Sequence, residues 1–336
     1  MQQLPGSLID IEYYLPEQVV HNSYFRDRFP EWKVDQTALR TGVLERHIAC
    51  QGETAYDLAL VAAKKLLDKN PSLSEKIDGI IFCTQSPDYV MPSNAFLLQR
   101  DLGLKKNILA FDYNLACSGF IYGLVMATSF IRSSVAKNLL LVTADTYSKY
   151  LAEGDRSTRM LFGDGAAVSW IGQIDDCGTE PLISSFGDFL LSSDGSGWDQ
   201  FVIRSGANRQ PKSCREAPDY NDKIAMNGLR VLNFVNDRVI KQLFELLANN
   251  CLAAEDIDQF FFHQASGLAL ESLRKKLKIG DEQMFSNLSA IGNTVSASVP
   301  ILIKDYFSHN RLPKGSRLLL SGFGVGYSWG SMLATK

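Results

Sequence analysis

The hydrophobic pattern of the first half of the chain recurs about 180 residues later. A charged turn followed by a continuous apolar run occupies residues 75–83 and again residues 255–263. A second apolar run at residues 138–142 matches residues 317–321 at a shift of 179. Continuous apolar runs of this length suit strands that are buried on both faces of a sheet. The pattern therefore predicts two pairs of equivalent buried strands.

An amphipathic helical pattern precedes the first of these strands in each half. Apolar residues recur three and four positions apart over residues 54–67 and 229–247. The order helix, strand, helix, strand thus occurs twice, and it predicts two packed α/β halves related by a pseudo-twofold axis, with helices covering mainly buried sheets. Asp-Asp-Cys-Gly-Thr interrupts the apolar pattern between them and divides the chain into residues 1–175 and 176–336.

Two segments of the second half are rich in Gly, Ser, Asn, Pro and charge. Residues 192–198 and 204–222 have this composition, which is typical of turns and of a long loop. Long loops in compact enzymes often cover sites. Two interpretations of these segments remain open, a lid over a site and a solvated insertion without a function.

Composition narrows the class of protein. The 336 residues carry 34 basic against 37 acidic side chains, a net charge of −3, so we expect no nucleic-acid partner. Six dispersed cysteines without a C-x-x-C pair indicate reduced thiols and a cytoplasmic protein. The N-terminal residues lack a signal-peptide pattern and no run of about 18 apolar residues occurs, so we expect neither secretion nor a membrane span. His and Cys show no ligand spacing, so we expect no metal.

Three polar residues stand at the ends of apolar elements. Cys117 opens a small-residue helical pattern, His263 closes an apolar run, and Asn293 lies on a glycine turn. A thiol at a helix N-terminus feels the positive end of the helix dipole, which lowers its pKa, and the free N–H groups there can bind an oxyanion. The repeat places Cys83 and His263 at equivalent strand ends near the interface between the halves. Together these residues predict a thiolate-based acyl-transfer centre.

Each of the three also has a purely structural interpretation, as a small buried cysteine, a buried histidine and a turn residue. Their order along the chain also suits a papain-like hydrolase, although such enzymes show no internal duplication. Residues 321–330 form a glycine-rich segment that permits close approach of the backbone to a substrate, with a plain hairpin as the alternative. A further segment, Phe162-Gly-Asp-Gly165, predicts a turn into a strand.

Over nearly its whole length the sequence resembles the β-ketoacyl-acyl carrier protein synthase III family of the thiolase superfamily. The resemblance implies a thiolase-like α/β fold, in which two pseudo-symmetric βαβαβ-type halves make a five-layered α-β-α-β-α arrangement, and a homodimer. It rests on six motifs in order: residues 40–49, the segment around Cys117, residues 162–165, His263-Gln264-Ala265, Gly292-Asn293-Thr294 with Ser298-Val299-Pro300, and residues 324–330.

This resemblance implies a Cys-His-Asn centre made of Cys117, His263 and Asn293. An acyl thioester would acylate Cys117, and a malonyl thioester would then lose carbon dioxide and attack the acyl-cysteine. His263 and Asn293 would donate hydrogen bonds to the developing enolate, and the main-chain N–H groups of Cys117 and Val325 would hold the oxyanion. The implied activity is that of an acyltransferase in fatty acid or related acyl-chain biosynthesis, without a cofactor, whose partner is acyl-CoA or acyl carrier protein.

The family's substrate contacts carry over less completely. Leu44 and Leu268 stand where the family has basic residues, and charge-assisted hydrogen bonds are worth roughly 1.5–3 kcal/mol each. We therefore expect weakened CoA binding and a carrier protein or an unusual acyl donor. The basic run Arg274 to Lys278 would suit an acidic carrier protein, with a solvated helix face as the alternative. The substrate-binding positions implied by the resemblance are Trp32, Met91, Arg156, Leu268, Phe323 and Gly324, of which Met91 would line the acyl pocket.

Three neighbouring functions remain open. A type III polyketide synthase has the same Cys-His-Asn set and a similar glycine loop. An acyltransferase that makes an ester or an amide would use the same acyl-cysteine and dispense with decarboxylation. The third is a non-catalytic subunit of a heterodimer.

Overall fold

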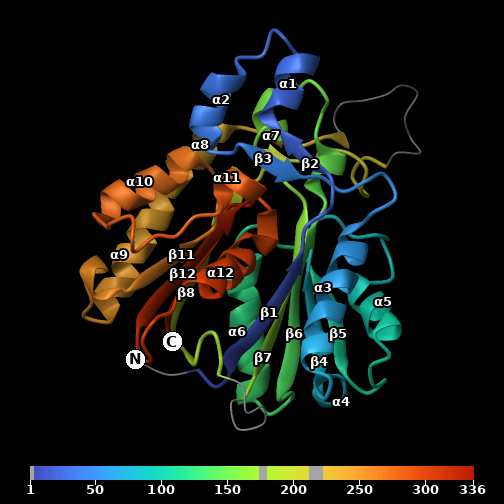
Figure 1. The fold of residues 1–336 in the computed structure, drawn as a ribbon, viewed down its shortest axis with the longest axis vertical. Helices are drawn as coiled ribbons and strands as arrows, with labels where there is room; N and C mark the ends of the chain where they lie inside the picture. The colour runs from blue at the N-terminus through green and yellow to red at the C-terminus, as the bar shows by residue number, and fades with distance from the viewer. Residues whose placement is uncertain (1–3, 174–179, 212–221) are drawn as a thin grey trace.

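Two mixed β-sheets are separated by a central layer of helices, and further helices cover their outer faces (Figure 1). The computed structural model describes residues 4–173, 180–211 and 222–336. The first sheet has the order β1 (Ser7–Tyr14), β7 (Gly165–Gly172), β6 (Asn138–Asp145), β4 (Gly79–Cys83) and β5 (Leu109–Tyr113). The second has the order β11 (Gln259–Phe262), β12 (Arg317–Gly324), β13 (Ser328–Thr335) and β8 (Ser185–Ser193).

The strand pairing confirms the internal repeat. The matched runs 75–83 and 255–263 contain β4 and β11, and the second matched pair lies in β6 and β12. In the first sheet β4 pairs parallel with β6, which pairs antiparallel with β7. In the second sheet β11 pairs parallel with β12, which pairs antiparallel with β13. Equivalent strands therefore have equivalent neighbours, which is what a duplicated unit requires.

Helices complete five layers, as the thiolase-like resemblance implied. Helices α6 (Gly119–Arg132) and α12 (Ser298–His309) form the central layer and contact both sheets. Helices α3 (Ala55–Lys69) and α5 (Asn94–Asp101) cover the outer face of the first sheet. The outer face of the second sheet is covered by α8 (Gly228–Phe234), a π-helical turn over Val235–Val239, α9 (Ile240–Asn249) and α10 (Gly267–Leu277).

Local sequence explains where the main helices lie. Thr54 and Asp57 form a capping box at the start of α3, as expected for the helical pattern over residues 54–67. The second pattern, residues 229–247, coincides with α8, the π-helical turn and α9. In the central layer, a Cβ at Gly123 would lie 2.4 Å from the Leu141 side chain, so the absence of a side chain lets α6 approach β6.

Several shorter elements lie at the two ends of the sheets in Figure 1. The proposed boundary at residue 175 falls outside the described residues, as does the middle of the 204–222 segment. Residues 192–198 are not wholly a turn, because β8 extends to Ser193 before a 3₁₀ turn over Gly195–Gly197. The remaining α-helices and strands of the described residues are α1 (Asn22–Arg28), α2 (Val34–Thr41), α4 (Leu73–Lys76), α7 (Arg156–Arg159), α11 (Leu288–Ile291) and the strand pairs β2 (Val19–His21) with β3 (Glu45–His47) and β9 (Phe201–Val202) with β10 (Ala225–Met226). Of these, α1, α2, α7, β2 and β3 lie at the upper end of the sheets in Figure 1, whereas α4 lies at the lower end.

No helix in the described part of the chain is long and apolar enough to span a membrane. Four of the six cysteines lie in that part, namely Cys50, Cys83, Cys117 and Cys251, and all four are free thiols.

Candidate active site

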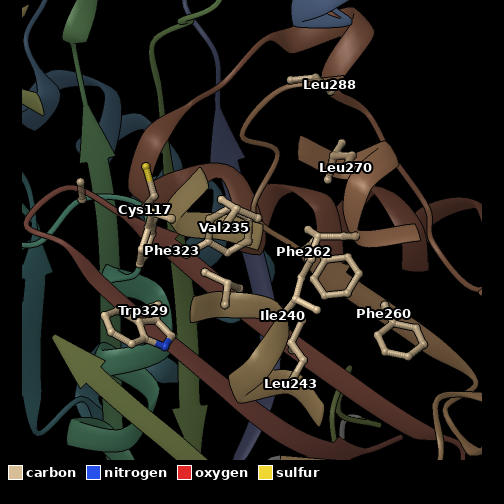
Figure 2. Close-up of a cluster of buried hydrophobic side chains, with 14 of the residues drawn as sticks. Cys117, Val235, Ile240, Leu243, Phe260, Phe262, Leu270, Leu288, Phe323 and Trp329 are labelled. Carbon is tan, nitrogen blue, oxygen red and sulfur yellow. The ribbon is translucent and has the colours of Figure 1, made fainter. Parts of the chain in front are cut away.

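Cys117 lies in the turn between β5 and α6, where it meets the end of β12. A Cβ at Gly324 would lie 2.9 Å from the Cys117 Cβ and 3.1 Å from its Sγ, so the two positions are in direct contact. Gly322 is equally close, because a Cβ there would lie 2.5 Å from the Cys117 carbonyl oxygen. Figure 2 shows Cys117 at the edge of the apolar cluster that contains Phe323, with its sulfur directed away from Trp329.

The electrostatics of this thiol differ from the expectation. Helix α6 begins at Gly119 with Ser118 as its N-cap, two residues later than expected. Burial raises the pKa of the Cys117 thiol, and the nearby Asp145 carboxyl raises it further, while only the residue's own backbone N–H lowers it. The expectation of a lowered pKa is therefore wrong for this structure. Desolvation outweighs the helix N-terminus, because a thiolate loses its hydration at a buried position.

His263 follows directly after β11 and lies against the same strand as Cys117. Its backbone N–H donates to the Ser321 carbonyl oxygen at 2.8 Å, and its ring packs edge-on against Phe323 with ring centroids 5.5 Å apart. The Nδ1 atom is buried and has no hydrogen-bond partner among the described residues. Burial lowers the pKa of His263 to about 3. The imidazole is therefore neutral at physiological pH and carries one N–H donor.

The Asn293 side chain is held in one orientation by two hydrogen bonds. Its Oδ1 accepts from the Val295 N–H at 2.9 Å, and its Nδ2 donates to the Ala265 carbonyl oxygen at 3.2 Å. The amide N–H₂ group therefore faces the segment that follows His263, with one hydrogen left for another acceptor. The backbone also ties this residue to the first half, since the Gly163 N–H donates to the Asn293 carbonyl oxygen at 3.0 Å.

Shared neighbours thus connect the three predicted catalytic residues. Strand β12 contacts Cys117 through Gly324 and His263 through Ser321 and Phe323, and the segment after His263 contacts Asn293. The interface between the two halves is where the repeat predicted they would meet. Phe323 and Gly324, predicted as substrate contacts, lie beside Cys117 and His263, and Val325 follows them at the turn into β13.

A cavity of about 590 Å³ adjoins this centre. Val325 and Tyr147 line it, and both pack in the same apolar cluster as Cys117. Ser205, Gly206 and Ala207 also line it, so the described start of the 204–222 loop forms part of the cavity wall. The exposed residues Tyr89 and Val90 also line the cavity.

Other predicted substrate contacts lie outside this centre. Trp32 stacks on Phe29, with ring centroids 4.1 Å apart and an interplanar angle of 9°, in a small cluster between α1 and α2. Arg156 is half-buried at the first residue of α7. Met91 and Leu268 are on the surface, with 79% and 46% of their area exposed. These four residues keep their predicted roles as hypotheses, but among the described residues of the single chain none of them makes a hydrogen bond or ring contact with Cys117, His263 or Asn293.

The basic run on α10 is partly neutralised by its own helix. Arg274 pairs with Glu271 at 2.9 Å and with Asp281 at 3.5 Å. Lys275 pairs with Glu271 at 3.0 Å. The solvated-face interpretation therefore accounts for Arg274 and Lys275, and a docking role would fall mainly on Lys276 and Lys278.

Asp145 and Ser296 belong to the site but were not predicted from the sequence. Asp145 ends β6 with no exposed surface, and its carboxylate accepts hydrogen bonds from the Ser296 hydroxyl and backbone N–H. Burial raises the pKa of Asp145 to about 7. A signal for it existed, because a charged residue that closes a mainly apolar strand is the same kind of feature that drew attention to His263.

Comparisons with known proteins give matches over nearly the whole chain. Two family models match the chain: that of 3-oxoacyl-[acyl-carrier-protein (ACP)] synthase III over residues 111–195, and that of its C-terminal part over residues 247–336. The β-ketoacyl-[acyl-carrier-protein] synthase III of Campylobacter curvus (strain 525.92) is 36% identical over 334 residues, which is 98% of this chain and 96% of that protein. The corresponding enzyme of Clostridium perfringens (strain ATCC 13124) is 36% identical over 98% of both chains.

Solved structures give the same result. A 3-oxoacyl-(acyl-carrier-protein) synthase III crystal structure superimposes with a TM-score of 0.90 at 38% identity, covering 99% of this chain and 100% of the other. The priming β-ketosynthase of the R1128 polyketide pathway superimposes with a TM-score of 0.87 at 25% identity, covering 99% and 97%. The similarity therefore extends over the whole duplicated fold.

Proposed function

Because the chain belongs to the 3-oxoacyl-[acyl-carrier-protein] synthase III family, and is thus a condensing acyltransferase of fatty acid biosynthesis, we propose that its reaction proceeds through an acyl group carried on Cys117. An acyl thioester donor loses its acyl group to the Cys117 sulfur, and the donor thiol leaves with the thiol proton. A malonyl thioester then loses carbon dioxide, and the resulting enolate carbon attacks the acyl-cysteine. The product is a 3-oxoacyl thioester, and Cys117 is regenerated.

The contact between Cys117 and Gly324, with His263 and Asn293 on shared neighbours, is the observation that carries this proposal. A neutral imidazole donates one N–H to the enolate oxygen, and the free hydrogen of the Asn293 amide supplies a second donor. Such donors stabilise charge that appears only as carbon dioxide leaves, so they act on the transition state. The N–H groups of Cys117 and Val325 are the proposed oxyanion donors.

Intact-protein mass spectrometry tests the proposal. The protein is exposed to a panel of acyl-CoA and acyl-carrier-protein donors and then to malonyl-acyl carrier protein. We expect a mass increase equal to one acyl group in the parent and none in Cys117→Ser, followed by carbon dioxide release and loss of the adduct. Hydrolysis of the donor without carbon dioxide release would favour the hydrolase, and ester or amide formation would favour the other acyltransferase; either result overturns the condensation mechanism.

We propose that contacts to a carrier protein, rather than to the nucleotide of CoA, contribute most to binding of the acyl donor. Leu44 and Leu268 are 63% and 46% exposed, so neither is part of the core, and neither can hold a phosphate. If a carrier protein supplies the missing contacts, kcat/KM for an acyl-carrier-protein donor will exceed that for the matching acyl-CoA. Equal values for the two donors would contradict this part of the proposal.

We propose that the chain acts as a homodimer, in the cytoplasm, where its free thiols remain reduced. The consecutive residues Tyr89, Val90 and Met91 are 58%, 95% and 79% exposed, and Tyr89 and Val90 line the cavity, so apolar surface is concentrated beside it. A second copy would cover this surface and bring Met91 toward the cavity of its partner. We expect Val90→Glu to sediment as a monomer, whereas Val135→Glu, at another exposed valine (58%), remains dimeric. A dimer in both variants would exclude this surface as the interface.

A further inference from the structure

The repeat pairs the site of Cys117 with a second site of the same geometry. At a shift of 179, Gly119 and Ser298 open the two central helices, and Asp145 and Gly324 close the strands β6 and β12. Cys117 corresponds in the same way to Ser296, and each lies two residues before its helix. In one half the helix start packs on Gly324, and in the other Ser296 packs on Asp145. At equivalent positions of the repeat, the first helix start therefore places the Cys117 thiol against Gly324, and the second places the Ser296 hydroxyl against the Asp145 carboxylate.

The carboxylate of Asp145 connects the two halves beside the site. One oxygen, Oδ2, accepts hydrogen bonds from the Ser296 hydroxyl and from its backbone N–H, the latter at 3.3 Å. The other, Oδ1, accepts from the Gln85 N–H at 2.8 Å. Ser296 follows Asn293 by three residues, and Gln85 lines the 590 Å³ cavity. A single buried carboxylate thus joins the cavity wall of the first half to the segment of the second half that carries Asn293.

Further contacts connect the neighbours of Asp145 to the cavity wall on one side and to the Asn293 amide on the other. The Gln85 side chain donates from Nε2 to the Asn114 Oδ1 at 2.8 Å and accepts from the Tyr147 hydroxyl, both on the cavity side. On the opposite side, Val295, immediately before Ser296, donates the hydrogen bond that fixes the Asn293 amide. Movement of the Ser296 turn would therefore change the direction of the Asn293 N–H₂ group.

From this arrangement we infer that Asp145 is a positioning residue for the condensation step, holding the Ser296 turn and through it the Asn293 amide where the enolate forms. The inference rests on the proposed function. It assigns Asp145 no contact with substrate. Because Asn293 is used only after decarboxylation begins, loss of this anchor slows condensation while acylation of Cys117 continues. A merely structural role for Asp145 would slow both steps together.

The substitution Asp145→Asn retains the shape of the side chain but cannot satisfy all its neighbours. Gln85 and Ser296 both present N–H groups to it, and an amide offers only one oxygen, so one donor would face the new N–H₂ group. The negative charge near Cys117 is also removed, and this change favours thiolate formation. Acylation is therefore expected to be unchanged or faster, with condensation slower.

Single-turnover measurements separate the two steps. The acyl-enzyme is formed with an acyl donor, its rate of formation is followed by intact mass, and its consumption is followed after addition of malonyl-acyl carrier protein. We expect Asp145→Asn to condense at least about tenfold more slowly and to acylate no more slowly than the parent. Ser296→Ala should also slow condensation selectively, but by a smaller factor. Ser296→Thr, which retains the hydroxyl, should condense at nearly the rate of the parent.

Asp112→Asn is the matched control, because Asp112 also accepts two backbone N–H groups, from Asn94 and Ala95, but at the start of α5 in the outer layer. It should leave both steps unchanged. Equal slowing of acylation and condensation in Asp145→Asn, or normal condensation in Ser296→Ala, overturns the inference; the Ser296 variants decide the matter if Asp145→Asn does not fold. Failure of the proposed function itself would appear differently, as an absence of condensation in the parent.

Discussion

The contact between Gly324 and Cys117 can be tested by adding one methyl group. In Gly324→Ala the new Cβ would lie 2.9 Å from the Cys117 Cβ and 3.1 Å from Sγ. Carbon atoms at optimal contact are about 3.5–4.0 Å apart. Because the obstructing Cβ is fixed to the backbone, rotation of the cysteine side chain cannot relieve the contact, and either the turn before α6 or the end of β12 must move by roughly 0.6–1 Å.

This displacement acts on the predicted nucleophile. Misplacing a reacting group by about 1 Å can cost on the order of 100-fold in rate, which corresponds to about 2.7 kcal/mol of activation free energy. Overpacking a buried site lowers the free energy of unfolding by about 1–3 kcal/mol. We therefore expect Gly324→Ala to remain folded, with a lowered Tm, and to acylate Cys117 about 30–100-fold more slowly than the parent.

The assay is the single-turnover rate of acylation by intact mass, alongside thermal unfolding. Gly52→Ala is the control, because a Cβ at Gly52 would meet no heavy atom within 4 Å. It should match the parent in both measurements. If Gly324→Ala acylates within about twofold of the parent and melts at the same temperature, the close packing of β12 on Cys117 does not constrain the reaction, and the reasoning is refuted.

Two predictions concern buried ionisable groups. The pKa of His263 is lowered to about 3, below its unfolded value near 6.5, so folding opposes its protonation and the unfolding free energy falls as pH drops through that range. Urea titrations of His263→Gln should show a shallower acid loss, by up to about 1.4 kcal/mol per pH unit; parallel curves would contradict this. Arg46 has no exposed surface, and its guanidinium donates to Val20, Asn22 and Met160. Arg46→Ala leaves three acceptors without their donor at roughly 1–3 kcal/mol each, so it should lower the unfolding free energy by at least about 3 kcal/mol in the same assay, and a loss below about 1 kcal/mol would show that these bonds contribute little.

The sequence predicted the duplicated architecture because strands that are buried on both faces appear in it as continuous apolar runs. Apart from Gln259, β4 and β11 contain only apolar residues after their charged turns, and two matches in register identified the equivalent strands. Cys117, His263 and Asn293 could be selected for the complementary reason, since each is a polar residue at the end of an apolar element. The family resemblance then supplied roles that the pattern alone left open.

What the sequence could not supply depends on contacts between distant segments. The pKa of Cys117 is set by how completely β12 and its neighbours exclude water, so the helix-dipole argument gave the wrong sign. The bond between Asp145 and Ser296 joins residues 151 positions apart, so the position of Asp145 at the end of a strand could not show which residue it binds. Trp32 was assigned to a substrate by resemblance, and its stacking on Phe29 depends on the way α1 turns into α2.

The central layer of the fold limits how such a chain could have arisen. Helices α6 and α12 each contact both sheets, so a half expressed alone would leave one side of its own central helix uncovered. A half-length ancestor would have needed a second copy of itself to bury that surface, which makes the present polypeptide a covalently fused pair. Coexpressed as separate fragments, its halves would accordingly become soluble only when they associate with each other.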